Sequence, residues 1–377
     1  MQISRLTYCR ATGWSAQMPE LDSEHTLVLT FGGSDFAGDP KPFADLARAF
    51  PKAVHLGCST SGEIQGANVL DDSMVVAVVR FDRTRLDVAF AQVANPDESY
   101  AAGLQIAEQL AQHDDLRAVF VLSDGLQVNG SSLVRGLNHI LPTSTVVTGG
   151  LAGDGVRFRS TWNLLDGRPV PGLVGAVGLY GDAIRVGHGS KGGWDIFGPE
   201  RRVTRSVGNV LYELDGRPAL QLYKEYLGDR AAGLPATGLL FPLALRAKAA
   251  DEKRLVRTIL AVDEDAQSMT FAGDVPEGSL AQLMRANFDR LIEGAANAGS
   301  ISCLPTSGPT LAIAISCVGR RLVLGERTEE EVEAVLRALP AGTEQIGFYS
   351  YGELSPYATG GCDLHNQTMT ITTFSEV

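Results

Sequence analysis

The chain has 377 residues, 44% of them apolar and 20% charged, a composition typical of a globular protein with sizeable cores. Its formal net charge of −12 argues against nucleic acid or an anionic membrane as the main partner. No apolar run reaches the roughly 18 residues of a membrane span, and the start of the chain has no secretory signal.

The first 150 residues alternate between strand and helix patterns. Runs rich in β-branched or aromatic residues predict strands over 26–33, 53–60, 73–81, 86–93 and 116–125. Helical spacing predicts helices over 40–50, 99–113 and 131–142, with Ser99 as an N-cap and Pro142 as a stop.

After the glycine-rich stretch 149–158 the pattern becomes mostly strand. Strands are predicted over 174–181, 183–190, 201–216, 255–264, 268–274, 311–318, 344–353 and 368–376. Helices are predicted from Pro218 onward and over 279–299 and 329–340.

These elements predict an α/β (mixed α+β) fold with mixed sheets flanked by helices. Asp215-Gly216 is a turn signal, so we expect an N-terminal domain over 1–215 and a C-terminal domain over 216–377. Because no Pro/Gly/Ser-rich or charged run separates them, the two domains are expected to pack closely.

One motif occurs twice. Gly57 to Ile64 and Gly347 to Leu354 both read G-x4-G-E-aliphatic, and both follow an apolar strand. Ala-Gly-Asp also occurs twice, but in a different order relative to these loops. We interpret the echo as a sign of two related, pseudo-symmetric halves whose loops face one site.

Cys58 lies in the first of these loops and raises the question of catalysis. A nucleophile elbow needs G-x-S-x-G, and here the second glycine comes five residues after the first. His55 is three residues from Cys58 in strand spacing, so it points to the opposite face. The sequence therefore favours a buried cysteine over a nucleophile, and we expect no enzymatic activity.

The five cysteines contain no CxxC pair, which excludes a disulfide framework and a zinc site and is typical of a cytoplasmic protein. Among the histidines, His188 lies between glycines near Trp194 and Phe197, and His365 follows a glycine pair. A single histidine in an apolar, glycine-lined pocket can ligate haem iron, whereas one that hydrogen-bonds a loop has only a structural role.

Six motifs together resemble the FIST proteins, which are bacterial sensory modules with an N-terminal and a C-terminal FIST domain. They are GCSTSGEI, GGLAGDG, VTRSVGNVLYELDGRPAL, SCVGRRLVLG, GFYSYGELSP and LHNQTMTITTFSE. The resemblance covers roughly residues 25 to 376. GGWDIFGP and YKEYLGD are similar to a narrower group, the nitric-oxide-sensing NosP proteins.

The resemblance implies a small-ligand sensor that contains haem and reports nitric oxide to a histidine kinase, diguanylate cyclase or phosphodiesterase in trans. His188, His365 and Cys58 are the candidate haem ligands, with Trp194 and Phe197 beside them. The expected pocket loops carry Gly57, Gly62, Glu63, Gly149, Gly150, Asp154, Tyr351, Gly352, Glu353 and Asn366.

Two alternatives stay open. The first is a FIST receptor without haem that binds a small metabolite such as an amino acid. The second belongs to another class, a cysteine- or serine-dependent enzyme that uses Cys58.

Overall fold

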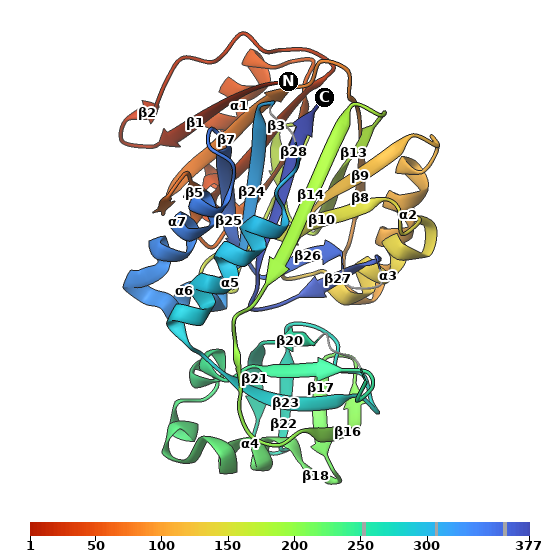
Figure 1. The fold of residues 1–377 in the computed structure, drawn as a ribbon, viewed down its shortest axis with the longest axis vertical. Coiled ribbons are helices and arrows are strands. Elements are labelled where there is room, and N and C mark those ends of the chain that lie inside the picture. Colours follow the sequence, from red (N-terminus) through yellow and green to blue (C-terminus); the bar gives the residue numbers. More distant parts are fainter. Residues whose placement is uncertain (251–253, 306–307, 357–359) are drawn as a thin grey trace.

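The computed structural model describes residues 1–250, 254–305, 308–356 and 360–377. It consists of a large body, formed by residues 1–191 and 288–377, and a small domain formed by residues 195–286 (Figure 1). Both chain ends lie on the body, at the end far from the small domain. In the described part of the chain, no helix has the length and apolar character that a bilayer crossing needs.

The body is built from three repeats of one unit. Each unit has four strands in the sheet order first, last, second, third, and the second and third strands are parallel. A helical segment connects these two strands in every unit, which is the usual way to join parallel neighbours.

The elements of the three units follow in chain order. Unit 1 contains β1 (Gln2–Cys9), β2 (Gly13–Trp14), β3 (Thr26–Gly33), η1 (Ser34–Gly38), α1 (Pro40–Ala49), β4 (Val54–Thr60), β5 (Glu63–Gln65), β6 (Asn68–Leu70) and β7 (Ser73–Arg80). Unit 2 contains β8 (Arg85–Gln92), η2 (Pro96–Glu98), α2 (Ser99–Leu110), β9 (Leu116–Ser123), α3 (Gly130–Ile140), β10 (Val146–Leu151), β11 (Asn163–Leu165), β12 (Arg168–Val170) and β13 (Leu173–Tyr180). Unit 3 contains β14 (Ile184–Lys191), α5 (Phe288–Ile301), β24 (Thr310–Cys317), α6 (Val318–Leu324), η5 (Gly325–Arg327), α7 (Thr328–Ala338), β25 (Glu344–Ser350), β26 (Gly352–Pro356), β27 (Cys362–His365) and β28 (Met369–Glu376).

Each unit gives a short hairpin to a neighbouring sheet. The hairpin β5–β6 of unit 1 pairs with β25 of unit 3, β26–β27 of unit 3 pairs with β10 of unit 2, and β11–β12 of unit 2 pairs with β4 of unit 1. The exchange is therefore cyclic, and it ties the first and last parts of the chain together.

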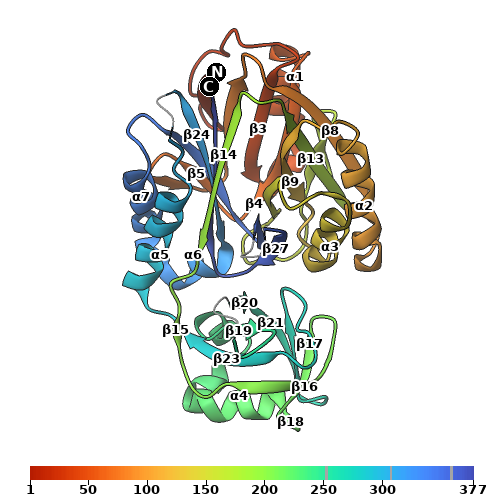
Figure 2. The same ribbon diagram turned by 45° about the vertical axis from the view of Figure 1, so that its right-hand side comes forward.

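The three sheets enclose a common apolar core. Phe31, Phe120 and Ile313, one from each sheet, lie in it, and helices cover the outer faces of the sheets (Figure 2). A glycine recurs at the same place of the third strand, at Gly57, Gly149 and Gly347, opposite a residue of the second strand. A β-carbon at Gly149 would overlap the carbonyl oxygen of Val121, and the other two glycines meet the same obstacle.

The echo in the sequence now has a structural explanation. Gly62-Glu63 and Gly352-Glu353 occupy the same position in units 1 and 3, directly after the third strand. Unit 2 does not repeat the motif, because Asp154 follows Gly149 at the place of Gly62 and Gly352, and its hairpin begins only at Asn163, so the motif marks units 1 and 3. Ala272-Gly273-Asp274 lies in the small domain and is unrelated to this position.

The small domain is an insertion in unit 3, between β14 and α5. Its elements are β15 (Asp195–Ile196), β16 (Arg201–Val207), β17 (Val210–Leu214), β18 (Arg217–Pro218), α4 (Ala219–Leu227), η3 (Gly228–Gly233), η4 (Ala236–Leu240), β19 (Leu243–Arg246), β20 (Leu255–Arg257), β21 (Ile259–Asp263), β22 (Ser268–Phe271) and β23 (Leu280–Arg285). The chain crosses between the two bodies over 192–194 and 286–287, which we call the two crossings.

The predicted α/β class with mixed sheets and flanking helices is confirmed. The predicted boundary near residue 216 falls in the turn between β17 and β18, inside the small domain, so the spatial division differs from it. The helix predicted over 279–299 begins only at Phe288. Its first part is β23, because Ala281 and Leu283 face the core of the small domain and the strand pairs with β19.

Candidate functional site

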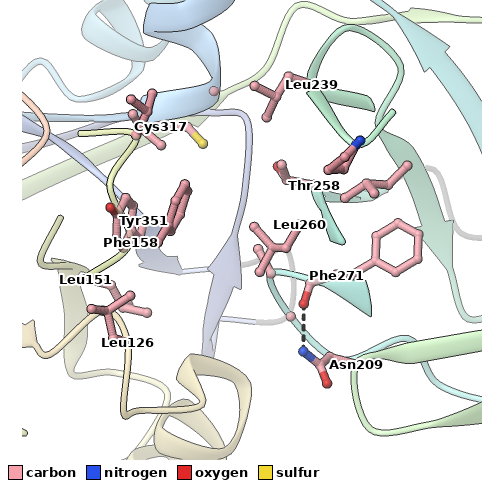
Figure 3. A pocket seen from close by; sticks show the side chains of 18 of the residues that line it. Leu126, Leu151, Phe158, Asn209, Leu239, Thr258, Leu260, Phe271, Cys317 and Tyr351 are labelled. Atoms are coloured by element: carbon pink, nitrogen blue, oxygen red, sulfur yellow. Dashed lines mark hydrogen bonds between the residues drawn. The ribbon is translucent and has the colours of Figure 1, made fainter. Parts of the chain in front are cut away.

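A cavity of about 780 Å³ lies between the body and the small domain (Figure 3). The body contributes the residues at the carboxyl ends of its strands: Gly125 after β9, Leu151 of β10, Cys317 of β24 and Tyr351 after β25. Loops at the carboxyl ends of parallel strands are a common place for ligands in α/β folds. The cavity has the size of a small-molecule site.

The small domain forms the opposite wall. It contributes Asn209 from the turn between β16 and β17, the segment 233–239, the segment 258–260 and Phe271 with the two residues that follow it. Figure 3 shows Thr258 and Leu260 on this wall, across the cavity from Tyr351 and Phe158. The two parts of the protein therefore form the cavity together.

The described lining is almost entirely apolar and contains no charged side chain. Asn129 is occupied elsewhere, since its amide oxygen caps α3 and its amide nitrogen donates to Asp274 at 3.1 Å. Asn209 donates to the carbonyl oxygen of Phe271 at 2.8 Å. The hydroxyl of Thr258 is buried and has no hydrogen-bond partner among the described residues.

Two stacked aromatic rings form part of the body wall. The rings of Phe158 and Tyr351 have centroids 4.6 Å apart and an interplanar angle of 15°. Tyr351 is 8% exposed and Phe158 is 49% exposed, so Phe158 is the outer ring of the stack. Its φ of 50° lies in the left-handed region, which an aromatic residue rarely adopts.

Asp154 holds Phe158 in this conformation. Its carboxylate accepts hydrogen bonds from the backbone N–H groups of Phe158, Arg159 and Ser160 at 2.8 to 3.0 Å and from the hydroxyl of Tyr351. Burial works to raise the pKa of Asp154, but these hydrogen bonds outweigh it and lower the pKa. Asp154 and Tyr351, both predicted from the sequence, therefore belong to the cavity wall and its support.

The predicted glycines have a packing role in the structure. Gly57 and Gly149 allow close approach of the second and third strands, Gly150 lies against Ile315, and Gly352 lies against Leu364. None of these four is among the described residues that line the cavity.

Gly62 lies against the guanidinium of Arg321. Arg321 lines a second cavity of about 530 Å³, which shares Val156, Val318 and Leu322 with the first. That guanidinium donates to both carboxylate oxygens of Asp71, at 2.8 and 2.6 Å, and to the carbonyl oxygen of Ser61. Arg321 is the only cation among the described residues that line this second cavity, and its charge is already neutralised by Asp71.

The two predicted glutamates fasten strands within the units. Glu63 accepts hydrogen bonds from the N–H and hydroxyl of Ser73, at the start of β7, and Glu353 accepts them in the same way from Thr368, just before β28. Burial raises the pKa of Glu63 to about 7 and that of Glu353 to about 8. Neither lines the cavity in the described part of the chain, so both serve the fold.

The candidate haem ligands lie away from the cavity. His188 is half-buried on β14 opposite Thr372, and His365 is buried at the end of β27, where its Nε2 donates to the carbonyl oxygen of Ser355 at 3.1 Å. Cys58 is fully buried within β4, and burial raises the pKa of its thiol well above the usual range. The described residues hold no cluster of three metal-ligating side chains.

Three further predicted residues lie outside the cavity lining. The indole N–H of Trp194 donates to the carbonyl oxygen of Gln367 at 2.8 Å, which fixes the first crossing to the body. Phe197 packs against the core of the small domain. Asn366 is fully buried, and its amide has no partner among the described residues.

A buried ion pair links the cavity wall to both crossings. Arg320 follows Cys317, Val318 and Gly319, which line the cavity, and it pairs with Glu331 at 2.7 Å with both side chains 0% exposed. The same guanidinium donates to the carbonyl oxygens of Gly192 and of Leu291, one near each crossing. Arg320 thus joins the start of α6 to residues at or beside both connections to the small domain.

Sequence reasoning missed the small-domain wall and the start of α6. Thr258 and Leu260 come from a segment that carries no motif, whereas Leu322 lies in SCVGRRLVLG, a motif that indicated the family but not the site. Leu260 and Leu322 are 43% and 44% exposed, unlike the buried leucines of the cores, and the sequence does not reveal this difference.

Comparison with known proteins gives a family-level match. The FIST N domain model matches residues 26–217 and the FIST C domain model matches residues 219–356, with a boundary beside the one predicted near 216. The uncharacterized protein MJ1623 of Methanocaldococcus jannaschii is 28% identical over 201 residues, which are 50% of this chain and 38% of that protein. The chain thus spans well under half the length of this curated relative.

Two solved structures of cyanuric acid hydrolase show only a distant likeness. The one from A. caulinodans has a TM-score of 0.34 and 8% identity over 93% of this chain and 89% of that one. The other has a TM-score of 0.26 and 12% identity over 75% of this chain and 99% of that one. At these scores the likeness supports no statement about fold or activity.

Proposed function

The chain belongs to the FIST family of sensory proteins that bind small ligands, and we propose that its ligand binds in the cavity between the body and the small domain. The observation that carries this proposal is the composition of the cavity, whose two walls come from the two bodies. A ligand that contacts both walls favours one relative arrangement of the bodies over others, which is how a binding event becomes a signal.

The start of α6 connects the cavity to both crossings. A ligand in the cavity contacts Cys317 to Gly319, and the next residue, Arg320, binds carbonyl groups beside both crossings. We propose that a histidine kinase, diguanylate cyclase or phosphodiesterase in trans reads the resulting change. Ligand-dependent change of such an enzyme's rate in a reconstituted mixture is the measurement that tests this.

A haem-bound nitric oxide receptor is the narrower reading that the sequence suggests. The apolar walls would suit a porphyrin, but no histidine is among the described lining residues. Burial raises the pKa of Cys317 to about 12 and that of Tyr351 above its usual range, so neither offers a ready anionic ligand. The cavity therefore does not fit a haem held by His188 or His365.

A visible spectrum of protein expressed with haem supply tests the haem reading separately. A Soret band that shifts with nitric oxide and is lost in H188A or H365A would support haem at another place in the molecule. The enzymatic alternative through Cys58 has no support from the geometry, because a fully buried, protonated thiol is a poor nucleophile.

The ligand site is tested with a variant that fills it. Leu322 lies on the cavity wall and is 44% exposed, so Leu322→Trp adds volume there without disturbing a core. Ile301, at the end of α5 and 54% exposed, lies outside the cavity lining, and Ile301→Trp is the matched control. Both variants and the native chain are screened by thermal shift against charged and uncharged metabolites and haemin.

A ligand at 100 times its Kd stabilises the native state by about 2.7 kcal/mol. We expect this stabilisation in the native chain and the Ile301→Trp control and its loss in Leu322→Trp. Ligands that stabilise Leu322→Trp as much as the native chain would place the site elsewhere and overturn the proposal.

A further inference from the structure

We propose that the ligand of the interdomain cavity is an uncharged aromatic molecule that stacks on Phe158 and carries one polar group toward Thr258. This inference rests on the proposed function and adds the chemical class of the ligand. It is argued from the charge of the lining, the aromatic stack and the unpartnered hydroxyl.

The lining excludes a charged ligand on energetic grounds. No described residue of the lining carries a charge, and an ion that enters an apolar site without a counter-charge loses hydration that nothing replaces. The nearby Arg257 cannot supply that charge, because it is 3% exposed and its guanidinium donates to the carbonyl oxygens of Asp274, at 2.9 Å, and Leu364, at 3.0 Å. A free amino acid, with two charges, fits this cavity poorly.

The stack on the body wall favours a flat ring. Tyr351 covers one face of Phe158, and Phe158 is nevertheless 49% exposed while it lines the cavity. A ligand ring on its outer face would extend the stack by one member, with the ring separations that aromatic pairs prefer. The hydrogen bonds from the backbone to Asp154 hold Phe158 in place before the ligand arrives.

Other apolar side chains of the cavity are also more exposed than usual. Val156 is 63% exposed, Leu260 is 43% exposed and Leu322 is 44% exposed, and all three line the same cavity. Clustered apolar exposure of this kind marks surfaces that a ligand or partner covers. An apolar ring would cover Leu260 from the small domain and Leu322 from the body together.

The hydroxyl of Thr258 favours a ligand with one polar group. It lies on the wall across from Phe158, and its hydroxyl has no hydrogen-bond partner among the described residues (Figure 3). A buried hydroxyl left without a partner is unfavourable, and a hydroxyl or carbonyl group on the ligand would satisfy it. The ligand is therefore expected to be mainly apolar with one such group.

Three naphthalene compounds test these features by fluorescence titration and calorimetry. They are 2-naphthol, which is uncharged and has a hydroxyl, 2-naphthoate, which has the same ring and a negative charge, and naphthalene itself. We expect saturable one-to-one binding of 2-naphthol and at least tenfold weaker binding of 2-naphthoate. The variants are Phe158→Leu, which keeps an apolar side chain without a ring, and Thr258→Val, which keeps the shape without the hydroxyl.

Phe158→Leu should weaken 2-naphthol binding about three- to tenfold, the size of an aromatic pair interaction. Its control is Phe288→Leu, since Phe288 is 43% exposed and lies outside the described lining. Thr258→Val should weaken 2-naphthol two- to tenfold and leave naphthalene unchanged.

Absence of 2-naphthol binding, equal affinity for 2-naphthoate, or an unchanged affinity in Phe158→Leu overturns this inference. If a charged ligand instead stabilises the native chain and loses its effect in Leu322→Trp, the cavity is still the ligand site and only the ligand class is wrong. If no ligand distinguishes Leu322→Trp from the native chain, the proposed function fails with it.

Discussion

Glu331→Gln removes the negative charge of the buried ion pair while keeping the size of the side chain. Glu331 accepts two hydrogen bonds from Arg320, at 3.0 and 2.7 Å, one from Ser316 at 2.9 Å and one from Tyr349 at 3.0 Å. Both members of the pair are 0% exposed, so water cannot replace the lost carboxylate. Leaving one partner of a buried pair unmatched costs about 3–5 kcal/mol, and we expect a loss of this size in the free energy of unfolding.

The control is Glu333→Gln on the same helix. Glu333 pairs with Arg337 at 2.5 Å, but the side chains are 44% and 74% exposed, so this change should cost about 0.5 kcal/mol or less. Urea unfolding followed by circular dichroism and tryptophan fluorescence gives both values. The effect of Glu331→Gln should persist in 1 M salt, because a buried pair is screened little. A loss below about 1 kcal/mol would refute the reasoning, since it would mean that the Arg320 charge is well solvated without Glu331.

Three further predictions follow from the fold. Gly149→Ala should lower the free energy of unfolding by about 1–3 kcal/mol, because the added β-carbon meets the carbonyl oxygen of Val121. Gly38→Ala is the control, since a β-carbon there meets no atom, and it should change the free energy of unfolding by less than about 0.5 kcal/mol in the same urea assay. Since burial raises the pKa of Glu63 to about 7 and of Glu353 to about 8, the folded state keeps protons that the unfolded chain releases near pH 4.5, so stability should fall as the pH rises from about 4.5 to 8. The free energy of unfolding, measured by urea at several pH values in this range, should depend less on pH in E63Q and in E353Q than in the native chain. If it falls as steeply with pH in the double variant as in the native chain, these two glutamates are not the cause. Replacing residues 195–286 by a short glycine-serine linker should leave a folded body, because Gly193 already lies against Arg290. The separate fragments 1–215 and 216–377 should not fold alone, because the sheets combine strands from both. Circular dichroism and gel filtration show whether each of these proteins is folded.

The sequence predicted most elements of the body because their patterns are local. The strand over Thr26–Gly33 and the helix over Thr328–Ala338 follow directly from β-branched runs and helical spacing. The spacing of the leucines predicts a helix over 280–285. This stretch is β23 because neighbouring strands of the small domain take up its backbone hydrogen bonds.

The candidate site was less accessible to sequence reasoning. The sequence predicts Asp154 and Tyr351 because they lie in distinctive loops, and in the structure they support the cavity. Phe158 and Thr258 are a hundred residues apart and meet only because the small domain folds against the body. The sequence suggests His188 and His365 as haem ligands, but they lie on β14 and β27 and are not among the described residues that line the cavity.

The cyclic exchange of hairpins has a consequence for synthesis on the ribosome. The hairpin β5–β6 is made early, yet its partner strand β25 is made near the end, since Ile64 pairs with Gly347. Until then its edge stays unpaired, as does the edge of β10 that later receives β26. Unpaired strand edges invite association with other chains, and contacts between distant parts of a chain form slowly. The sheet of unit 1 is complete once β12 is made, but the sheets of units 2 and 3 keep open edges until the last strands emerge.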